Sequence, residues 1–173
     1  RGAVPRLFET PIEVGRKREL ALGEDVLIVT AGITTEEALR ARAALAKAGL
    51  SVRHLHLNTI KPFDAAAFLD HIASVRYGVV TLENHVIDGG IGSLVAEVMA
   101  DNGIGKRLRR LGLRDTYAHG GSRSYLMRYY GLDALALVRG IEDLMGQDFN
   151  ITEADLDAAR IEAVHSLVKA EGL

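Results

Sequence analysis

The segment Tyr77–Asn102 constrains the fold of this chain more than any other part of it. An apolar run at 78–82 is followed by a short polar segment (83–85), a glycine-rich turn at 89–92 and a run with helical spacing. The first run has the length and composition of a strand that is buried on both faces. In segment 91–99 the apolar residues recur every three or four positions, which is typical of a helix packed on a sheet. The sequence therefore predicts a strand, a glycine turn and a helix at the carboxyl edge of a parallel sheet.

Three further segments, at 25–32, 51–57 and 107–113, have the composition of strands, and helical patterns lie between them. An edge strand or hairpin is expected around Leu7–Gly15. Strands that alternate with helices in this way predict a doubly wound α/β fold with helices on both faces of the sheet. Functional loops are expected beyond the carboxyl ends of the strands. These loops are 32–35, 58–64, 83–93 and 115–124.

Helix starts carry their own signals. Thr34-x-x-Glu37 and Thr152-x-x-Asp155 have the spacing of capping boxes, and Asp64 stands where an N-cap is expected. The last helix has an apolar arc wider than one packing face needs, so it either docks on another chain or covers the core of this one. The predicted helices span about 34–48, 64–72, 91–102, 124–130, 133–145 and 152–169.

The length, charge and residue composition of the chain exclude several classes of protein. The chain has 173 residues, 48% of them hydrophobic, which supports one domain with a sizeable core. A net charge of −2 and the lack of aromatics within the basic run 106–110 argue against nucleic acid as a partner. No cysteine is present, so disulfides and thiolate chemistry are excluded. No apolar run is long enough to span a membrane, and we expect a cytoplasmic protein.

The glycine turn and the residues before it allow two interpretations. A helix start with free amides could hold an anion, but the turn lacks the third glycine of a dinucleotide fingerprint, so tight packing is favoured. Glu83 and His85 could act in acid–base chemistry, but one isolated pair is weak evidence, and hydrogen bonding across an interface is favoured.

Two other polar groups attract attention. His119, Ser122 and Arg123 lie in one glycine-rich loop and are candidates for binding an anion, with a solvated connection as the alternative. His54 and His56 share one side of a strand, but no third ligand is nearby in the sequence. We therefore predict no metal site there, and expect two exposed or hydrogen-bonded histidines on an edge strand.

Several motifs in the same order resemble the C-terminal domain of thiamine-diphosphate-dependent enzymes of the transketolase type. The same domain ends deoxyxylulose-phosphate synthases and the β-subunits of 2-oxo-acid dehydrogenases. The resemblance covers about residues 1–146. Its motifs are Arg1–Pro5, Asp25–Gly32, Thr59–Asp64, Val80–His85, Gly89–Glu97, and Gly121-Ser122 ahead of Tyr129–Asp133.

The resemblance implies a three-layer α/β domain with a mostly parallel five-stranded sheet. In this family thiamine diphosphate and Mg²⁺ are bound by other domains, and this domain builds the dimer. We therefore predict no catalytic, cofactor-binding or metal-binding residue in this chain. The partners implied are a second copy and an N-terminal transketolase domain or subunit. The interface candidates are Glu83, Asn84, His85, Gly89, Gly90, Gly92 and Ser93.

The function implied is the C-terminal part of a transketolase, which moves a two-carbon ketol group between sugar phosphates. Two alternatives stay open: the end of a 2-oxo-acid dehydrogenase β-subunit, and a non-catalytic assembly domain that binds an anion or nucleotide. Arg1–Pro5 is similar to an interdomain connector, so we expect a fragment of a longer protein, inactive by itself. The expected parts are a connector with an edge hairpin (1–24), the α/β domain (25–146) and a helical extension (147–173).

Overall fold

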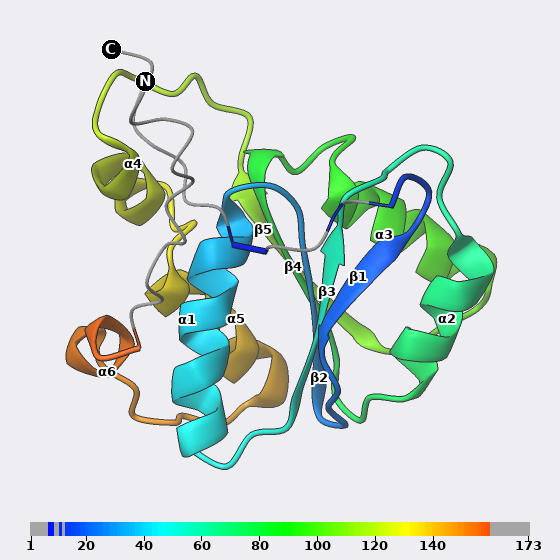
Figure 1. Cartoon of the computed structure of the whole chain (residues 1–173), viewed down its shortest axis with the longest axis horizontal. Coiled ribbons are helices and arrows are strands. Elements are labelled where there is room, and N and C mark those ends of the chain that lie inside the picture. Colours follow the sequence, from blue (N-terminus) through cyan, green and yellow to red (C-terminus); the bar gives the residue numbers. More distant parts are fainter. Residues whose placement is uncertain (1–6, 9–10, 12, 160–173) are drawn as a thin grey trace.

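The computed structural model describes residues 7–8, 11 and 13–159. Its centre is a five-stranded sheet in the order β1-β3-β2-β4-β5 (Figure 1). Strands β2 to β5 run parallel to one another, and only β1 is antiparallel to its neighbour β3. The predicted mostly parallel α/β sheet is therefore confirmed. The strands are β1 (Lys17–Ala21), β2 (Val26–Thr30), β3 (Val52–Leu57), β4 (Gly78–Val86) and β5 (Arg107–Leu113).

Helices cover both faces of the sheet and make a three-layer architecture (Figure 1). One face carries α1 and α5, with α4 and α6 beside them, and the other face carries α2 and α3. The predicted helix pair on either side of Gly131 is present as α4 and α5. The helices are α1 (Thr34–Lys47), α2 (Ala65–Ala73), α3 (Ile91–Asp101), α4 (Arg123–Tyr129), α5 (Ala134–Met145) and α6 (Glu153–Asp157).

Strand β2 is buried along its whole length, because helices pack on both of its faces. Val26 and Ile28 belong to the apolar core under α1 and α5, whereas Leu27 and Val29 belong to the core under α2 and α3. Alternate side chains of a strand point to opposite faces, so a continuous apolar run is required here.

Two of the predicted helix starts are confirmed. The Asp64 carboxylate accepts the backbone N–H of Ala67 at 3.1 Å and caps α2. Thr152 and Asp155 form the predicted capping box at the start of α6. Both signals are local, so the sequence alone contains them.

The predicted capping box at Thr34 is wrong. Helix α1 already includes Thr34, and its N-cap is Ile33, which makes no side-chain cap bond. The Thr34 hydroxyl is instead at hydrogen-bond distance from two carbonyls, Ala31 at 2.8 Å and Leu82 at 2.9 Å. Glu37 accepts the N–H of Ala134 at 2.9 Å. Leu82 and Ala134 belong to β4 and α5, and their contacts outweigh the local capping pattern.

The edge strand lies later than predicted. The described residues of segment 7–15 are not in a strand, and β1 begins at Lys17, opposite Leu57 of β3. Segment 13–15 runs past the end of β3, because Asn58 donates to the Glu13 carbonyl at 3.0 Å. A Cβ on Gly23 would lie 2.3 Å from the backbone of Val52, so this glycine allows the close turn between β1 and β2.

Strand β3 is an interior strand, which corrects the prediction that its histidines lie on an edge. Because β1 pairs along its outer side, His54 is fully buried under α1 and His56 is half-buried.

Near the end of the described residues, Leu156 of α6 is buried against the α1/α5 core. The predicted continuation of this helix to Lys169 lies outside the described residues. Within the described ranges, no helix is long and apolar enough to cross a membrane.

Candidate functional site

The carboxyl ends of the parallel strands meet at the upper edge of the sheet in Figure 1. The glycine turn between β4 and α3 lies at this edge, as the sequence predicts. Strand β4 is an interior strand, between β2 and β5, so its loop is flanked by loops from both neighbours. Ligands of doubly wound proteins bind at this edge, and the turn is therefore the first place to examine.

A side chain of the protein itself binds the free N–H groups at the N-terminus of α3. The two carboxylate oxygens of Glu83 accept the backbone N–H groups of Ile91 and Gly92, at 2.8 and 3.0 Å. Glu83 is 3% exposed, so the interaction is sheltered from water. A helix start carries about half a positive charge, which stabilises the buried carboxylate. The position that would receive a phosphate in a nucleotide-binding protein is occupied by Glu83.

The glycines of the turn make room for this carboxylate. A Cβ built on Gly90 would lie 2.0 Å from the Glu83 Oε2 atom. A Cβ on Gly92 would lie 2.8 Å from the Thr81 hydroxyl and 3.0 Å from the Arg110 side chain. The distances of 2.0 Å at Gly90 and 2.8 Å at Gly92 are shorter than real Cβ contacts, so the two positions favour glycine for close packing.

A second set of bonds fixes the loop between Glu83 and α3. The Ser93 hydroxyl donates to the Ile87 carbonyl at 2.7 Å and accepts the Gly89 N–H at 3.0 Å. Arg110 of β5 donates to the same hydroxyl at 3.1 Å. The Ile87 N–H donates to the Leu113 carbonyl at 2.9 Å. The loop is therefore held by its own serine and by the neighbouring strand.

The seven predicted interface residues thus divide into two groups. Glu83 and Gly92 are buried, and Gly90 and Ser93 are half-buried, so these four hold the turn together. Asn84, His85 and Gly89 are exposed and can meet another chain. The His85 Nδ1–H donates to the Val86 carbonyl at 2.8 Å, which orients the ring. Glu83 is buried and bonded to the start of α3, whereas His85 is exposed and bonded to Val86, so the two side chains do not form a catalytic pair.

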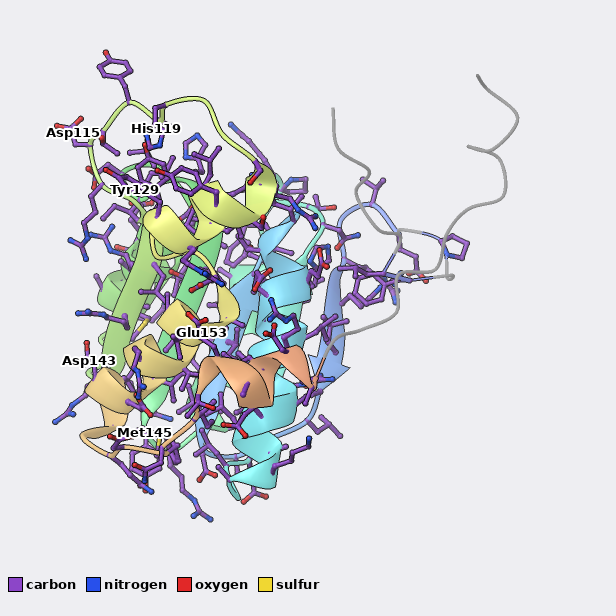
Figure 2. All side chains as sticks on the ribbon, turned by 90° about the vertical axis from the view of Figure 1, so that its left-hand side faces the viewer. Asp115, His119, Tyr129, Asp143, Met145 and Glu153 are labelled. Atoms are coloured by element: carbon purple, nitrogen blue, oxygen red, sulfur yellow. The ribbon has the colours of Figure 1, made fainter. Side chains whose placement is uncertain are left out.

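The residues predicted to bind an anion have separate structural roles. The Ser122 hydroxyl accepts the Tyr125 N–H and caps α4, at 3.3 Å. Arg123 pairs with Glu36 of α1 at 3.1 Å. The His119 ring packs edge-on against Tyr129, with ring centres 4.8 Å apart, and Figure 2 labels both residues.

The aromatic cluster around His119 is a feature that the sequence analysis missed. Tyr125, Tyr129 and Tyr130 all have ring centres within 5.7 Å of the His119 ring. His119 Nδ1 is 3.0 Å from the Tyr130 hydroxyl, a hydrogen-bond distance. The spacing of three tyrosines in and just after one short helix is a usable signal, but the approach of His119 depends on the loop path.

Fold and turn together define a class of protein: a doubly wound α/β domain in which the chain's own carboxylate takes the usual phosphate position. Residues 15–137 match the family described as "Transketolase, C-terminal domain". This chain belongs to that family, and the resemblance seen in the sequence is confirmed.

Three relatives illustrate the family. A putative transketolase C-terminal section of Methanocaldococcus jannaschii is 38% identical over 140 residues, which is 81% of this chain and 43% of that protein. A 6-deoxy-6-sulfo-D-fructose transketolase subunit of a Clostridium species is 38% identical over 131 residues, or 76% of this chain and 40% of that protein. A 1-deoxy-D-xylulose-5-phosphate synthase of Syntrophotalea carbinolica is 36% identical, over 78% of this chain and 21% of that protein.

A solved structure has the same fold. The chain superposes on a protein described as "Split gene transketolase, inactive beta4 tetramer" with a TM-score of 0.77 and 31% identity. The match covers 84% of this chain and 48% of that one. The chain therefore spans less than half the length of these relatives.

Proposed function

We propose that this chain is the C-terminal, dimer-building domain of a thiamine-diphosphate-dependent transketolase. The whole enzyme would move a two-carbon ketol group between sugar phosphates. Family membership supports this proposal, as does the likeness to a split-gene transketolase over 84% of the chain. In this proposal residues 25–146 are the domain, 1–24 connect it to the part before it, and 147–173 extend it.

The cofactor belongs to other parts of the enzyme in this proposal. Residues 7–8, 11 and 13–159 contain no group of three or more His, Cys, Asp or Glu side chains that could hold a metal ion. The glycine turn does not fit a diphosphate either, because Glu83 already accepts its amides. When bound elsewhere, the cofactor supplies the carbanion chemistry of the reaction. We assign no chemical step to this chain.

The assembly role depends on the segment 83–93, which includes the end of β4 and which we call the β4–α3 loop. Its backbone is fixed by Glu83, Ser93 and Arg110, while Asn84 and His85 remain exposed. A preorganised surface loses little conformational entropy when it binds a partner. We infer that this loop meets a second copy of the chain and so holds two active-site regions in register.

The enzymatic part is tested by reconstitution. The purified chain with thiamine diphosphate, Mg²⁺, xylulose 5-phosphate and an aldose phosphate should show no ketol transfer. Adding the N-terminal transketolase domains or subunit should produce it. Turnover by the chain alone would contradict the assignment of the cofactor, and no turnover by the complete enzyme would contradict the transketolase function.

The assembly part is tested at the exposed loop. Asn84→Arg places a long charged side chain in the inferred interface without touching the Glu83 carboxylate. We expect the dimer to dissociate in sedimentation experiments at micromolar concentrations, while the circular dichroism spectrum stays the same. Asp70→Arg, on the exposed side of α2, is the matched control and should leave the dimer intact. A wild-type monomer would contradict the dimer-building role, and a dimer unaffected by Asn84→Arg would place the interface elsewhere.

The two alternatives differ in their support. Occupation of the glycine turn by Glu83 argues against an anion- or nucleotide-binding assembly domain at that position. The end of a 2-oxo-acid dehydrogenase β-subunit stays an alternative prediction. Reductive acylation of a lipoyl domain by the complete enzyme, without ketol transfer, would favour it.

A further inference from the structure

One turn of the chain contains a pair of residues that can react with each other. Asn102 and Gly103 are both exposed and lie in the turn between α3 and β5. Of the four asparagines in the sequence, only Asn102 is followed by glycine. Because glycine has no Cβ to shield its backbone nitrogen, that nitrogen can attack the side-chain amide of the residue before it. The proposed function makes no use of this turn.

Two backbone hydrogen bonds close the turn. Gly103 has a φ of 63°, and its N–H donates to the Ala100 carbonyl at 3.1 Å. The Ile104 N–H donates to the Met99 carbonyl at 2.9 Å. A left-handed glycine after the last helical residues, with bonds that reach back to their carbonyls, is a common end of an α-helix. The closed turn is therefore the C-terminal stop of α3.

The side chain of Asn102 is fixed in the same turn. Its Nδ2 atom donates to the Val98 carbonyl at 2.8 Å, and its ψ is 12°. At this ψ the Gly103 nitrogen points away from Asn102 Cγ, so the two atoms can meet only after ψ rotates and the bond to Val98 breaks. The same rotation removes the Gly103 N–H from the Ala100 carbonyl. The closed turn is therefore unreactive, and only an open turn can react.

Ile104 anchors the closed turn. Its half-buried side chain packs against the apolar core under α2 and α3. An apolar contact of this kind often accompanies the backbone bonds of a helix end. Because the turn lies at the surface and is held by a few bonds, it opens far more often than the whole domain unfolds.

We propose that Asn102 is a site of spontaneous deamidation and that opening of the α3 turn sets its rate. In the open turn the Gly103 nitrogen bonds to Asn102 Cγ. The Cγ–Nδ2 bond breaks, and ammonia leaves with the proton of the Gly103 amide. Water then opens the cyclic imide at one of its two carbonyls, which gives either aspartate or isoaspartate at position 102. This reaction does not depend on the transketolase assignment.

Either product weakens the turn that protected the asparagine. A carboxylate at position 102 cannot donate to the Val98 carbonyl, and it lies at the negative end of the α3 dipole. Isoaspartate also adds one carbon atom to the main chain, so the bonds from Gly103 and Ile104 lose their geometry. The reaction therefore loosens the connection between α3 and β5.

The sequence contains one further pair of this kind, Asp88 and Gly89. The Gly89 N–H donates to the Ser93 hydroxyl at 3.0 Å. A carboxylate is also a poorer electrophile than an amide. Asp88 is therefore an internal reference, and it should form isoaspartate more slowly than Asn102.

Incubation of the 173-residue chain at pH 8 and 37 °C tests the proposal. A synthetic peptide with the sequence of residues 99–106 represents a turn that is always open. Mass spectrometry of proteolytic peptides measures the loss of the Asn102 amide, and a protein-isoaspartate methyltransferase measures isoaspartate. We expect the folded chain to react about 10- to 100-fold more slowly than the peptide. Equal rates would overturn the proposal, and so would the absence of product at Asn102 over several half-lives of the peptide.

A matched pair of variants tests the opening step. Ile104→Ala removes the apolar anchor, and we expect the reaction at Asn102 to become about five- to tenfold faster. Ile60→Ala removes the same atoms from an exposed side chain in another loop and should leave the rate unchanged. Equal rates in all three proteins would contradict control by the turn. If Ile104→Ala fails to fold, the comparison between the wild-type chain and the peptide still decides the proposal.

Asn102→Asp tests the consequence of the reaction. We expect hydrogen exchange at the Gly103 and Ile104 amides to be about three- to tenfold faster than in the wild-type chain. Asn84→Asp introduces the same change at an exposed site of β4 and should leave these two amides unaffected. Unchanged exchange in Asn102→Asp would contradict the loosening of the turn.

Discussion

The two faces of the sheet each bury an ionisable side chain, and they treat it differently. On the α2/α3 face, both oxygens of Glu83 accept N–H groups from the start of α3. On the α1/α5 face, His54 bonds a threonine through one nitrogen and has no partner on the other among the described residues. A buried carboxylate is stabilised where the N–H groups of a helix start bind it. A buried imidazole whose hydrogen-bond partner is a hydroxyl stays neutral.

The largest effect is expected at Glu83. Glu83→Ala leaves two buried N–H groups without an acceptor and removes two charge-assisted bonds. We expect unfolding in urea to show a loss of about 3–5 kcal/mol. Glu83→Gln keeps one acceptor oxygen and should lose less. If Glu83→Ala costs under about 1 kcal/mol, water must replace the carboxylate, and the comparison between the faces fails.

A smaller loss is expected when the space for the carboxylate is filled. The added methyl group of Gly90→Ala would lie 2.0 Å from Glu83 Oε2 and displace it. We expect a loss of about 2–3 kcal/mol in the same urea experiment. Gly105→Ala is the control, because a Cβ there meets nothing within 4 Å, and its effect should stay within about 0.5 kcal/mol. Equal effects of the two substitutions would show that the turn is not tightly packed.

The neutral histidine predicts a pH dependence. Because folding lowers the pKa of His54 from 6.5 to about 3, the unfolded chain takes up more protons than the folded one between these values. Stability is therefore complete above about pH 6.5 and falls as the pH drops, by up to about 1.4 kcal/mol per pH unit for this residue. Urea unfolding between pH 7 and 5 measures this slope. His54→Gln should flatten it, and an unchanged slope would assign it to other groups.

The smallest effect is expected at Lys106, which mirrors Glu83 at the opposite end of a helix. Its ammonium group donates to the carbonyls of Ile72 and Ala73 at 2.7 and 2.9 Å, and to that of Val75, at the end of α2. Lys106→Met keeps the aliphatic stem and removes the charge. We expect a loss of about 1 kcal/mol in thermal unfolding. Lys47→Met, at the exposed end of α1, is the control and should change little.

Much of the fold could be predicted because its signals are local. The apolar run of β2, the glycine turn and the cap at Asp64 each depend on residues close together in the sequence. The path of β1 could not be predicted, because its position is set by pairing with β3 across the turn at Gly23. The wrong prediction that His54 lies on an edge strand has the same cause, because β3 would be an edge strand if β1 did not pair with it.

The candidate site was only partly readable from the sequence. Glu83 could be found as the polar residue that follows a buried apolar run, but its partners are the amides of residues eight and nine positions further on. An acidic residue between such a run and a glycine-rich turn is the signal that could have indicated this. The Thr34 bond to Leu82 spans 48 positions, and no local pattern contains it.

The carboxylate inside the β4–α3 turn has a consequence for the solution around the protein. Free phosphate, nucleotides and phosphorylated sugars all compete for unoccupied helix starts. At the start of α3 the Glu83 carboxylate already occupies this position. Because Glu83 is part of the chain, its effective concentration at the helix start exceeds that of any metabolite. The turn therefore keeps one shape whether phosphate esters are scarce or abundant.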